Sequence, residues 1–330
     1  MDFVLLIFVM SFPLALIVLI IGFIILIKGA DLFVKGASSI ANIFGVSSLV
    51  IGLTVVAFGT SAPELAVNII SALKGNASFV VGNIVGSNTF NILAILGISS
   101  LIRPLIVQTS TTWKEIPFSL LAIVLVFLMG NDRFIDGQPY ETLSRIDGFI
   151  LLSFFIIFLY YIVALAKSGG MPMENNVKTY SRWMSVGFIV LGLGMLAGGA
   201  QLIINSATTI ARSFGISDLL IGLTILAAGT SLPELATSAV AAYRGQSDIA
   251  IGNIVGSNIF NIFWILGLTA VIYPIPLPPG AGVDIAVTVI ATLSLFAFMF
   301  VGNRHKLDRW QGGTMFVAFI AYLAFLFIRG

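Results

Sequence analysis

The sequence has little charge, a single histidine and no cysteine. Charged residues make up 9% of its 330 residues, whereas a soluble domain carries about 25% because its surface faces water. The lack of cysteine excludes disulfides and thiolate metal sites. A formal net charge of +2 without a dense basic segment gives no footprint for nucleic acid. These absences exclude a soluble domain and a nucleic-acid-binding protein, and they leave a chain whose surface faces apolar surroundings.

Hydrophobic residues account for 58% of the sequence, and many lie in long runs. A helix needs about 20 apolar residues to cross a lipid bilayer, and runs such as 4–27 and 149–166 approach or exceed that length. The second residue, Asp2, is acidic, whereas a signal peptide carries basic residues near its start. We therefore expect the first apolar run to be retained as a membrane helix and not cleaved as a signal peptide. The pattern of polar, glycine and proline breaks predicts an all-α polytopic membrane protein with ten transmembrane helices: 12–37, 46–73, 77–101, 114–130, 147–167, 183–211, 216–243, 247–273, 283–302 and 309–328.

The two halves of the sequence repeat each other at a shift of 170 residues. Residues 51–97 and 221–267 align without a gap and are identical at 27 of 47 positions, which shared membrane composition does not produce. The one long polar connector, 168–182, separates 1–167 from 183–330. Each half holds an odd number of predicted spans, so the second half enters the membrane in the opposite sense. We therefore predict two inverted five-helix repeats around a site near the bilayer midplane.

The distribution of Lys and Arg sets the expected orientation, because cytoplasmic loops carry more positive charge. With the N-terminus outside, ten Lys and Arg residues fall on the cytoplasmic side and five on the other. We therefore expect a multi-pass protein of the cell (plasma) membrane with both termini outside and the 168–182 loop in the cytoplasm.

Two acidic residues, Glu64 and Glu234, lie deep within predicted spans. A carboxylate at the bilayer centre costs roughly 2.5–3.5 kcal/mol, so such a residue is functional by default. Prolines precede both glutamates and remove a backbone donor, which predicts that helices 2 and 7 break and free carbonyl oxygens. The alternative is a kink that binds nothing, and the equivalent positions of the two acids in the repeat favour an ion site. One turn before each glutamate, on the same helix face, stand Thr60 and Thr230.

A second repeated motif places three polar side chains four residues apart on helices three and eight. The two sets are Asn83, Ser87 and Asn91, and Asn253, Ser257 and Asn261. Carboxylates, hydroxyls, amide oxygens and backbone carbonyls together suit Ca²⁺ or Na⁺, and they lack the imidazole and thiolate ligands that other metals prefer. Ser87 and Asn91 could instead join helices, and we interpret Asn83 and Asn253 as structural.

The remaining polar residues receive simpler interpretations. Asp31 has no acidic counterpart in the second repeat, where Gln201 stands, so it is interpreted as a polar contact or a vestibule charge. His305 lies in a basic turn and is expected to be solvated. Asp132, Asp136 and Asp147 lack the spacing of an EF-hand and are interpreted as a solvated loop.

The paired segments Gly-Thr-Ser-x-Pro-Glu (59–64 and 229–234) and Gly-Asn-Ile-Val-Gly-Ser-Asn (82–88 and 252–258) resemble the two alpha repeats of the sodium/calcium exchanger family, within the calcium/cation antiporter superfamily. The ten-span layout resembles its prokaryotic members. The resemblance implies a central site that opens alternately to each side. The ligands it implies are Thr60, Ser61, Glu64 and the Ala57 carbonyl with Ser87 and Asn91, and Thr230, Ser231, Glu234 and the Ala227 carbonyl with Ser257 and Asn261.

The same resemblance implies that the long first and sixth helices slide across the core to switch access. Their glycine-rich stretches, 29–36 and 192–199, fit a smooth sliding face. The connector 168–182 is too short to hold the calcium-sensing domains of animal exchangers, so regulation of that kind is not expected.

One position departs from the family pattern. Well-known members carry an aspartate where this chain has Asn261, and both repeats here place asparagine at that position. The fixed charge of the predicted site is therefore about −2, which one Ca²⁺ or two Na⁺ ions balance. This departure leaves the exchange stoichiometry, and any potassium site, open.

These observations predict a secondary active antiporter that exchanges Na⁺ for Ca²⁺ and is electrogenic. The transported ions are its substrates; we expect no cofactor, no enzymatic activity and no obligate protein partner. The alternatives are an H⁺/Ca²⁺ exchanger, since a buried glutamate can bind a proton, and a K⁺-dependent exchanger. A cation channel is a different class and needs a continuous pore, whereas inverted repeats with broken helices favour alternating access.

Overall fold

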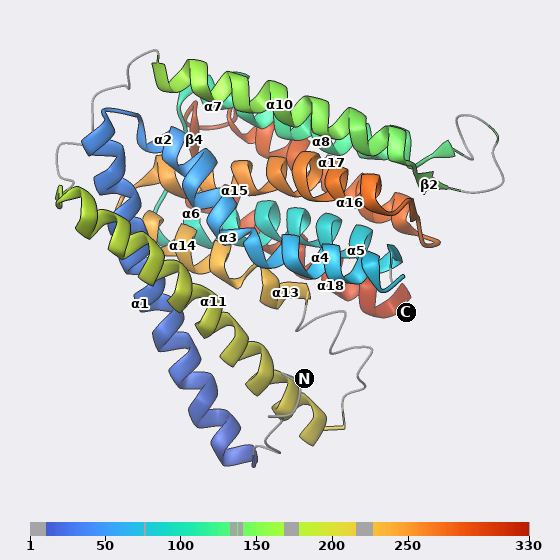
Figure 1. Cartoon of the computed structure of the whole chain (residues 1–330), viewed down its shortest axis with the longest axis horizontal. Coiled ribbons are helices and arrows are strands. Elements are labelled where there is room, and N and C mark those ends of the chain that lie inside the picture. The colour runs from blue at the N-terminus through green and yellow to red at the C-terminus, as the bar shows by residue number, and fades with distance from the viewer. Residues whose placement is uncertain are drawn as a thin grey trace.

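The computed structural model describes residues 11–75, 77–132, 137, 141–167, 178–215 and 227–329. These residues form a bundle of helices with four short strands (Figure 1). Three stretches of the described residues are π-helical and carry the label η. The elements of the first half are α1 (Phe12–Phe44), α2 (Ser48–Ile51), η1 (Gly52–Val56), α3 (Ala57–Thr60), α4 (Ala62–Leu73), α5 (Ala77–Thr89), η2 (Phe90–Leu96), α6 (Gly97–Ile102), α7 (Thr109–Trp113), α8 (Glu115–Met129) and α10 (Arg145–Lys167). Those of the second half are α11 (Arg182–Ser213), α13 (Ala227–Thr230), α14 (Leu232–Tyr243), α15 (Ser247–Ile259), η4 (Phe260–Leu266), α16 (Gly267–Ile272), α17 (Ala281–Phe298) and α18 (Arg309–Arg329).

Eight of these helical segments are long and apolar enough to cross a membrane, and a bent pair makes a ninth. The bent pair joins Ser48–Thr60 to Ala62–Leu73 at 44° and corresponds to the predicted broken helix 2. The predicted seventh span, 216–243, lies partly outside the described residues, because only its part from Ala227 onward is described. The multi-pass helical class is confirmed, and the count of ten spans stays a prediction.

The two longest helices, α1 and α11, run side by side and extend beyond the rest of the bundle (Figure 1). Glycines let them approach closely: a Cβ built on Gly29 would lie 3.1 Å from the Gly192 carbonyl oxygen, and one built on Gly199 would lie 3.0 Å from the Gly22 carbonyl oxygen. Close approach of backbones over small residues is the usual way that membrane helices associate. Gly29, Gly36, Gly192 and Gly199, which lie in the stretches expected to form a sliding face, therefore pack α1 against α11.

The centre of the bundle consists of two interrupted helices, α5–η2–α6 and α15–η4–α16. Within them, 78% and 83% of the most apolar window is buried, against 17–39% for the other spans. Both carry the polar motifs of the repeat, and both switch to π-helix within them, at Phe90 and Phe260, one residue before the last asparagine of each motif. Such π-helical insertions in α-helices are frequent at functional sites. The polar motifs therefore lie where lipid does not reach.

Two pairs of short antiparallel strands, which sequence periodicity did not predict, join the halves of the chain. Strand β1 (Leu105–Ile106) pairs with β4 (Lys306–Leu307), and β2 (Thr142–Leu143) pairs with β3 (Ile275–Pro276). Each pair joins one strand from each half. Leu105 and Ile275 are equivalent under the 170-residue shift, yet the two pairs lie at opposite ends of the bundle (Figure 1). The inverted arrangement of the two halves stays a prediction.

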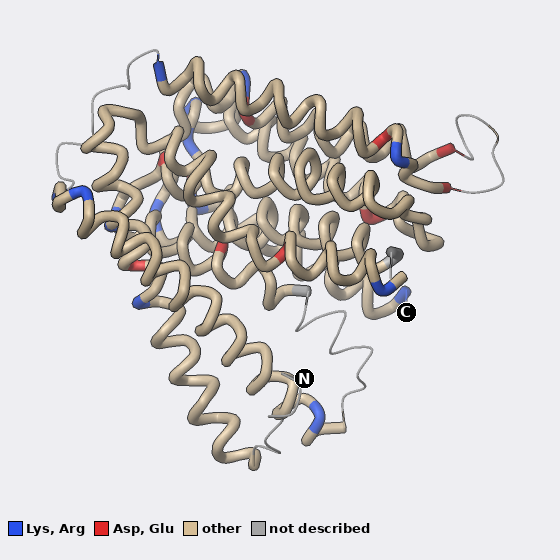
Figure 2. Tube along the Cα trace, in the orientation of Figure 1, with Lys and Arg blue, Asp and Glu red and all other residues tan. Residues whose placement is uncertain are grey.

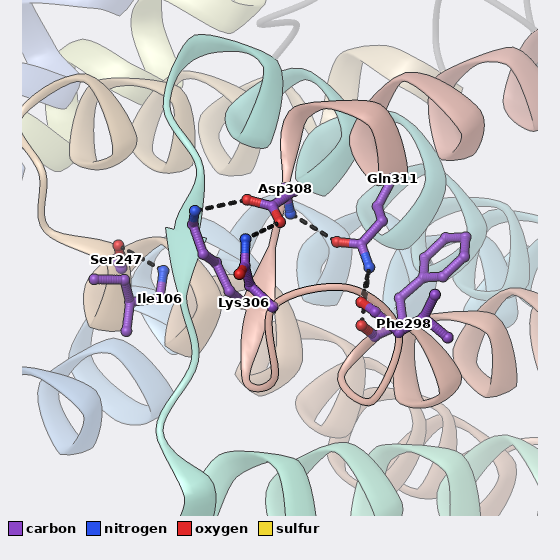
Figure 3. A network of polar contacts seen from close by, with 8 residues as sticks. Ile106, Ser247, Phe298, Lys306, Asp308 and Gln311 are labelled. Atoms are coloured by element: carbon purple, nitrogen blue, oxygen red, sulfur yellow. Dashed lines mark hydrogen bonds and ion pairs between the residues drawn. The ribbon is translucent and has the colours of Figure 1, made fainter.

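Polar side chains form a network of hydrogen bonds and ion pairs at the end of the bundle that holds β1 and β4 (Figure 3). Asp308 precedes α18 and pairs with Lys306 at 2.7 Å, and its backbone amide donates to the Gln311 side chain. The ammonium of Lys306 and the amide of Asn303 hold the pKa of the Asp308 carboxyl below its usual range. Most Lys and Arg residues lie near the ends of helices, as expected for side chains at a membrane surface (Figure 2).

Candidate ion-binding site

The site starts from the break in helix 2 and its equivalent in the second repeat. Helix α3 ends at Thr60 and α4 begins at Ala62; Ser61 between them has φ −84° and ψ 4°. Ser231 separates α13 from α14 in the same way, with φ −91° and ψ 7°. A proline at the second position of α4 and of α14 lacks the N–H that a continuous helix needs, so each helix restarts at the serine. The break predicted from the sequence is confirmed in both repeats.

Each restarted helix carries its glutamate in the first turn. Glu64 and Glu234 are both 1% exposed, and they lie at the N-termini of the twelve-residue helices α4 and α14. The N-terminus of a helix carries a partial positive charge, which stabilises a carboxylate there. Two buried carboxylates are thus held at the ends of two helices that belong to different repeats.

Hydrogen bonds cross between the repeats at the two breaks. The Ser61 hydroxyl donates to Glu234 Oε1 at 2.9 Å, and the Ser231 hydroxyl donates to Glu64 Oε1 at 3.1 Å. The serine of each repeat therefore binds the glutamate of the other. This exchange brings both glutamates into one site, although 170 residues separate them along the chain.

The serines of the second motif join the same site. Ser87 and Ser231 are linked through their hydroxyl oxygens at 3.1 Å, and the Ser257 hydroxyl donates to Glu234 Oε1 at 3.4 Å. The motifs on the broken helices and on the central helices thus meet, as the sequence predicted.

Each glutamate keeps one oxygen free. Among the described residues, neither Glu64 Oε2 nor Glu234 Oε2 has a hydrogen-bond partner, and no described Lys or Arg forms an ion pair with either carboxylate. Leaving a buried carboxylate oxygen without a partner is costly, so the arrangement favours a bound cation or proton. The described residues contain no cluster of three or more His, Cys, Asp or Glu, so neutral oxygens must complete the coordination of a metal ion here.

Thr60 and the Ala57 carbonyl lie beside the break but already have partners. The Thr60 hydroxyl lies 3.1 Å from the Val56 carbonyl oxygen and 3.0 Å from Asn253 Oδ1. The Ala57 carbonyl accepts the Ser61 N–H at 3.0 Å. A bound ion would share the Ala57 carbonyl with the Ser61 N–H, whereas the Thr60 hydroxyl donates its hydrogen and keeps lone pairs for an ion.

The equivalent residues of the second repeat are described in part. Ala227 is the first described residue of α13, and Thr230 is buried one turn before Glu234. Asn253 behaves as the structural residue that the sequence suggested, because its amide donates to Ser238 and to the Glu234 carbonyl. Asn83, its counterpart, is buried without a hydrogen-bond partner among the described residues.

Asn91 and Asn261 are buried at the start of the two π-helical stretches. Each donates its amide N–H at 3.0 Å to an asparagine of the other repeat, Asn91 to Asn258 and Asn261 to Asn88. Within the described part of the chain, no hydrogen bond joins Asn91 or Asn261 to a glutamate. Asn88 and Asn258 were not among the predicted site residues, although the repetition of Gly-Ser-Asn in both halves could have identified them.

Polar residues outside the site have definite partners. Asp31 forms ion pairs with Lys35 on its own helix and with Arg244 at the end of α14, which confirms the interpretation as a polar contact. His305 Nδ1 lies 2.9 Å from the Thr112 hydroxyl oxygen, so this histidine is bonded to the protein and not simply solvated. Asp132 accepts the Thr142 N–H; Asp136, assigned to the same loop, lies outside the described residues.

A further buried acid, Glu115, was not predicted. Glu115 is fully buried at the start of α8 and accepts a hydrogen bond from Tyr161 on α10. A cavity of about 290 Å³ adjoins the pair, lined by Lys114, Glu115, Phe118, Ile157, Phe158 and Tyr161. The two residues of this pair lie 46 positions apart in the sequence, so no local sequence motif predicts their contact.

Residues 14–164 and 184–328 match the family model described as sodium/calcium exchanger protein. The chain belongs to the sodium/calcium exchanger family. It is therefore a membrane transporter and not an enzyme, and the resemblance drawn from the paired motifs is confirmed. The family match covers both halves of the chain on either side of the connector.

Relatives of known name support this membership. The inner membrane protein YrbG of Escherichia coli (strain K12) is 35% identical over 95% of this chain and 97% of its own. The sodium/calcium exchanger MaX1 of Methanosarcina acetivorans is 32% identical over 94% of this chain and 98% of its own. A solved structure of the sodium-calcium exchanger NCX_Mj, soaked with 10 mM Na⁺ and no Ca²⁺, is 35% identical and has a TM-score of 0.80. It covers 95% of this chain and 99% of its own.

Proposed function

We propose that this exchanger-family protein is a secondary active antiporter that exchanges Na⁺ for Ca²⁺ across the cell membrane by alternating access. The observation that carries the proposal is the crossed serine–glutamate pair, Ser61 with Glu234 and Ser231 with Glu64. It gathers two carboxylates and several hydroxyls in a buried place without a described basic partner. Oxygen ligands around carboxylate anchors suit Ca²⁺, and Na⁺ takes the same kind of ligand.

The proposed ligands divide into three kinds. The carboxylates are Glu64 and Glu234, whose Oε2 atoms have no partner among the described residues. The carbonyl and amide oxygens are those of Ala57, Ala227, Asn91 and Asn261, and the hydroxyls are those of Thr60, Ser61, Ser87, Thr230, Ser231 and Ser257. The names of NCX_Mj and MaX1, both sodium/calcium exchangers, support Na⁺ and Ca²⁺ as the ions.

The charge of the site bears on stoichiometry. Two glutamates give about −2, so one Ca²⁺ leaves the site near neutral, and three Na⁺ would leave it near +1. Neutral oxygens such as those of Ser87 and Ser257 can offset part of a residual charge through their dipoles. We propose a 3:1 exchange, which moves one net charge per cycle and couples transport to the membrane potential at roughly 2.3 kcal/mol per 100 mV.

Alternating access is proposed to use α1 and α11, with both termini outside and the 168–182 loop in the cytoplasm. The glycine contacts between α1 and α11 support movement of the two helices together. Their contact with the rest of the bundle includes the partly exposed ion pair between Asp31 and Arg244.

Calcium uptake into proteoliposomes tests the proposal. An imposed Na⁺ gradient at equal pH on both sides should drive uptake, and Glu64→Gln and Glu234→Gln should each abolish it while the protein stays folded. Each variant removes half of the fixed charge of the site. Glu115→Gln is the matched control, since it removes a buried carboxylate outside the site and should retain transport. Uptake driven by a pH gradient alone, a requirement for K⁺, or passive Ca²⁺ flux without Na⁺ would each contradict Na⁺/Ca²⁺ antiport.

A further inference from the structure

Four buried asparagines form a network of hydrogen bonds between the two central helices. Asn88 and Asn91 come from the first repeat, and Asn258 and Asn261 occupy the equivalent positions of the second. The Asn88 amide donates to the Asn258 backbone carbonyl at 3.2 Å, and the Asn258 amide donates to the Asn88 backbone carbonyl at 3.5 Å. The network is therefore symmetric between the repeats.

The two backbone carbonyls determine which way every amide in the network faces. A carbonyl oxygen only accepts, so the NH₂ groups of Asn88 and Asn258 must point to the backbone. Their Oδ1 atoms then face Asn261 and Asn91, and each accepts an amide N–H at 3.0 Å. The NH₂ groups of Asn91 and Asn261 are thus engaged, and their Oδ1 atoms remain buried acceptors with no partner among the described residues.

This orientation matters for binding a cation. An asparagine ligand must present its oxygen, because an NH₂ group turned toward the ion would repel it. A free amide can rotate by half a turn and present either group. Asn91 lies four residues after Ser87, whose hydroxyl bonds to Ser231 in the site, so both lie on the same side of their helix.

We infer that Asn88 and Asn258 are positioning residues, which hold Asn261 and Asn91 with their carbonyl oxygens available to the transported cation. The inference rests on the proposed function, because it takes Asn91 and Asn261 as ligands. Neither Asn88 nor Asn258 coordinates the ion; each acts through the asparagine of the opposite repeat. Fixing a ligand beforehand lowers the entropy that ion binding must remove.

Asn88→Ala tests the inference through the Ca²⁺ dependence of uptake in proteoliposomes. The Ca²⁺ concentration for half-maximal uptake should rise about tenfold or more, the size expected when a polar contact to a charged group is lost. Thr89→Val is the matched control. Thr89 is the next residue on the same helix, and its hydroxyl forms a buried hydrogen bond of 2.6 Å with Thr288 of α17. Removing this bond should lower the thermal midpoint to a similar extent without changing the Ca²⁺ dependence.

A double-mutant cycle separates positioning from a general loss of packing. If Asn88 acts through Asn261, the double variant Asn88→Ala/Asn261→Ala should bind Ca²⁺ no more weakly than Asn261→Ala alone. Effects that add in full would overturn the inference. Asn258→Ala with Asn91→Ala gives the equivalent cycle, and Asn88→Ser serves if Asn88→Ala does not fold.

The cycle also distinguishes failure of the inference from failure of the proposed function. Unchanged Ca²⁺ dependence in Asn88→Ala and Asn261→Ala, together with loss of uptake in Glu64→Gln, would refute the positioning role and leave Na⁺/Ca²⁺ exchange intact. Wild-type vesicles that take up no Ca²⁺ under a Na⁺ gradient would refute the function itself.

Discussion

Replacing Gly29 with alanine should separate α1 from α11 and destabilise the protein. A Cβ on Gly29 would lie 2.7 Å from the Met195 Cβ, 2.9 Å from the Leu196 backbone nitrogen and 3.1 Å from the Gly192 carbonyl oxygen. Two of these three atoms belong to the backbone, so no side-chain rotation relieves the contact. The helices must move apart, and overpacking of this kind costs about 1–3 kcal/mol.

Gly198→Ala on α11 is the matched control. Gly198 is exposed, and a Cβ built on it meets nothing within 4 Å. Alanine there should stabilise the helix by about 0.5–1 kcal/mol, because glycine has more backbone freedom to lose on folding. The two variants should therefore differ by about 1.5–4 kcal/mol in the free energy of unfolding, although each changes one glycine in the same helix pair.

Thermal unfolding of the purified protein in detergent measures the difference. Gly29→Ala should have a midpoint lower than that of Gly198→Ala by roughly 3 °C or more, at about 2 °C per kcal/mol. Equal midpoints would mean that the two helices are not packed through their glycines. A lower midpoint for Gly198→Ala would refute the assignment of the packed and the open faces.

Three further predictions concern topology and charge. Accessibility labelling should place both termini outside and the 168–182 loop in the cytoplasm; termini on opposite faces would contradict the odd-span inverted repeat. Reversal potentials in proteoliposomes should follow a 3:1 exchange and shift with the imposed voltage, whereas a 2:1 exchange would be indifferent to it. Asn261→Asp should change the cation affinity or make transport pH-dependent, because a carboxylate oxygen would replace the amide that now donates to Asn88 Oδ1. Unchanged affinity, Na⁺ dependence and pH profile in that variant would place Asn261 outside the site.

The sequence predicted those features that depend on local chemistry repeated in both halves. Proline within a helix removes a backbone donor and kinks or breaks the helix, so the breaks at Ser61 and Ser231 could be predicted. The predicted inverted repeats bring two equivalent acids together near the middle, so the proximity of Glu64 and Glu234 could be predicted as well. Identical residues at a fixed shift carry this information without any knowledge of packing.

The features that the sequence did not predict depend on contacts between residues that are distant in the sequence. The strands are two residues long, too short for a periodic pattern to identify. The pairing of Glu115 with Tyr161 and the bonds between Asn88 and Asn261 depend on which helices become neighbours. The packing of Gly29 against α11 was not predicted, because a glycine-rich helix face has the same sequence whether it slides or packs tightly against another helix.

The crossed serine–glutamate bonds also limit how such a protein could have arisen. In one repeat alone, Glu64 has no Ser231 to donate to it, and Ser61 has no Glu234 to accept from it. A polypeptide with a single repeat therefore has half a site, and a second copy of the repeat is needed to complete it.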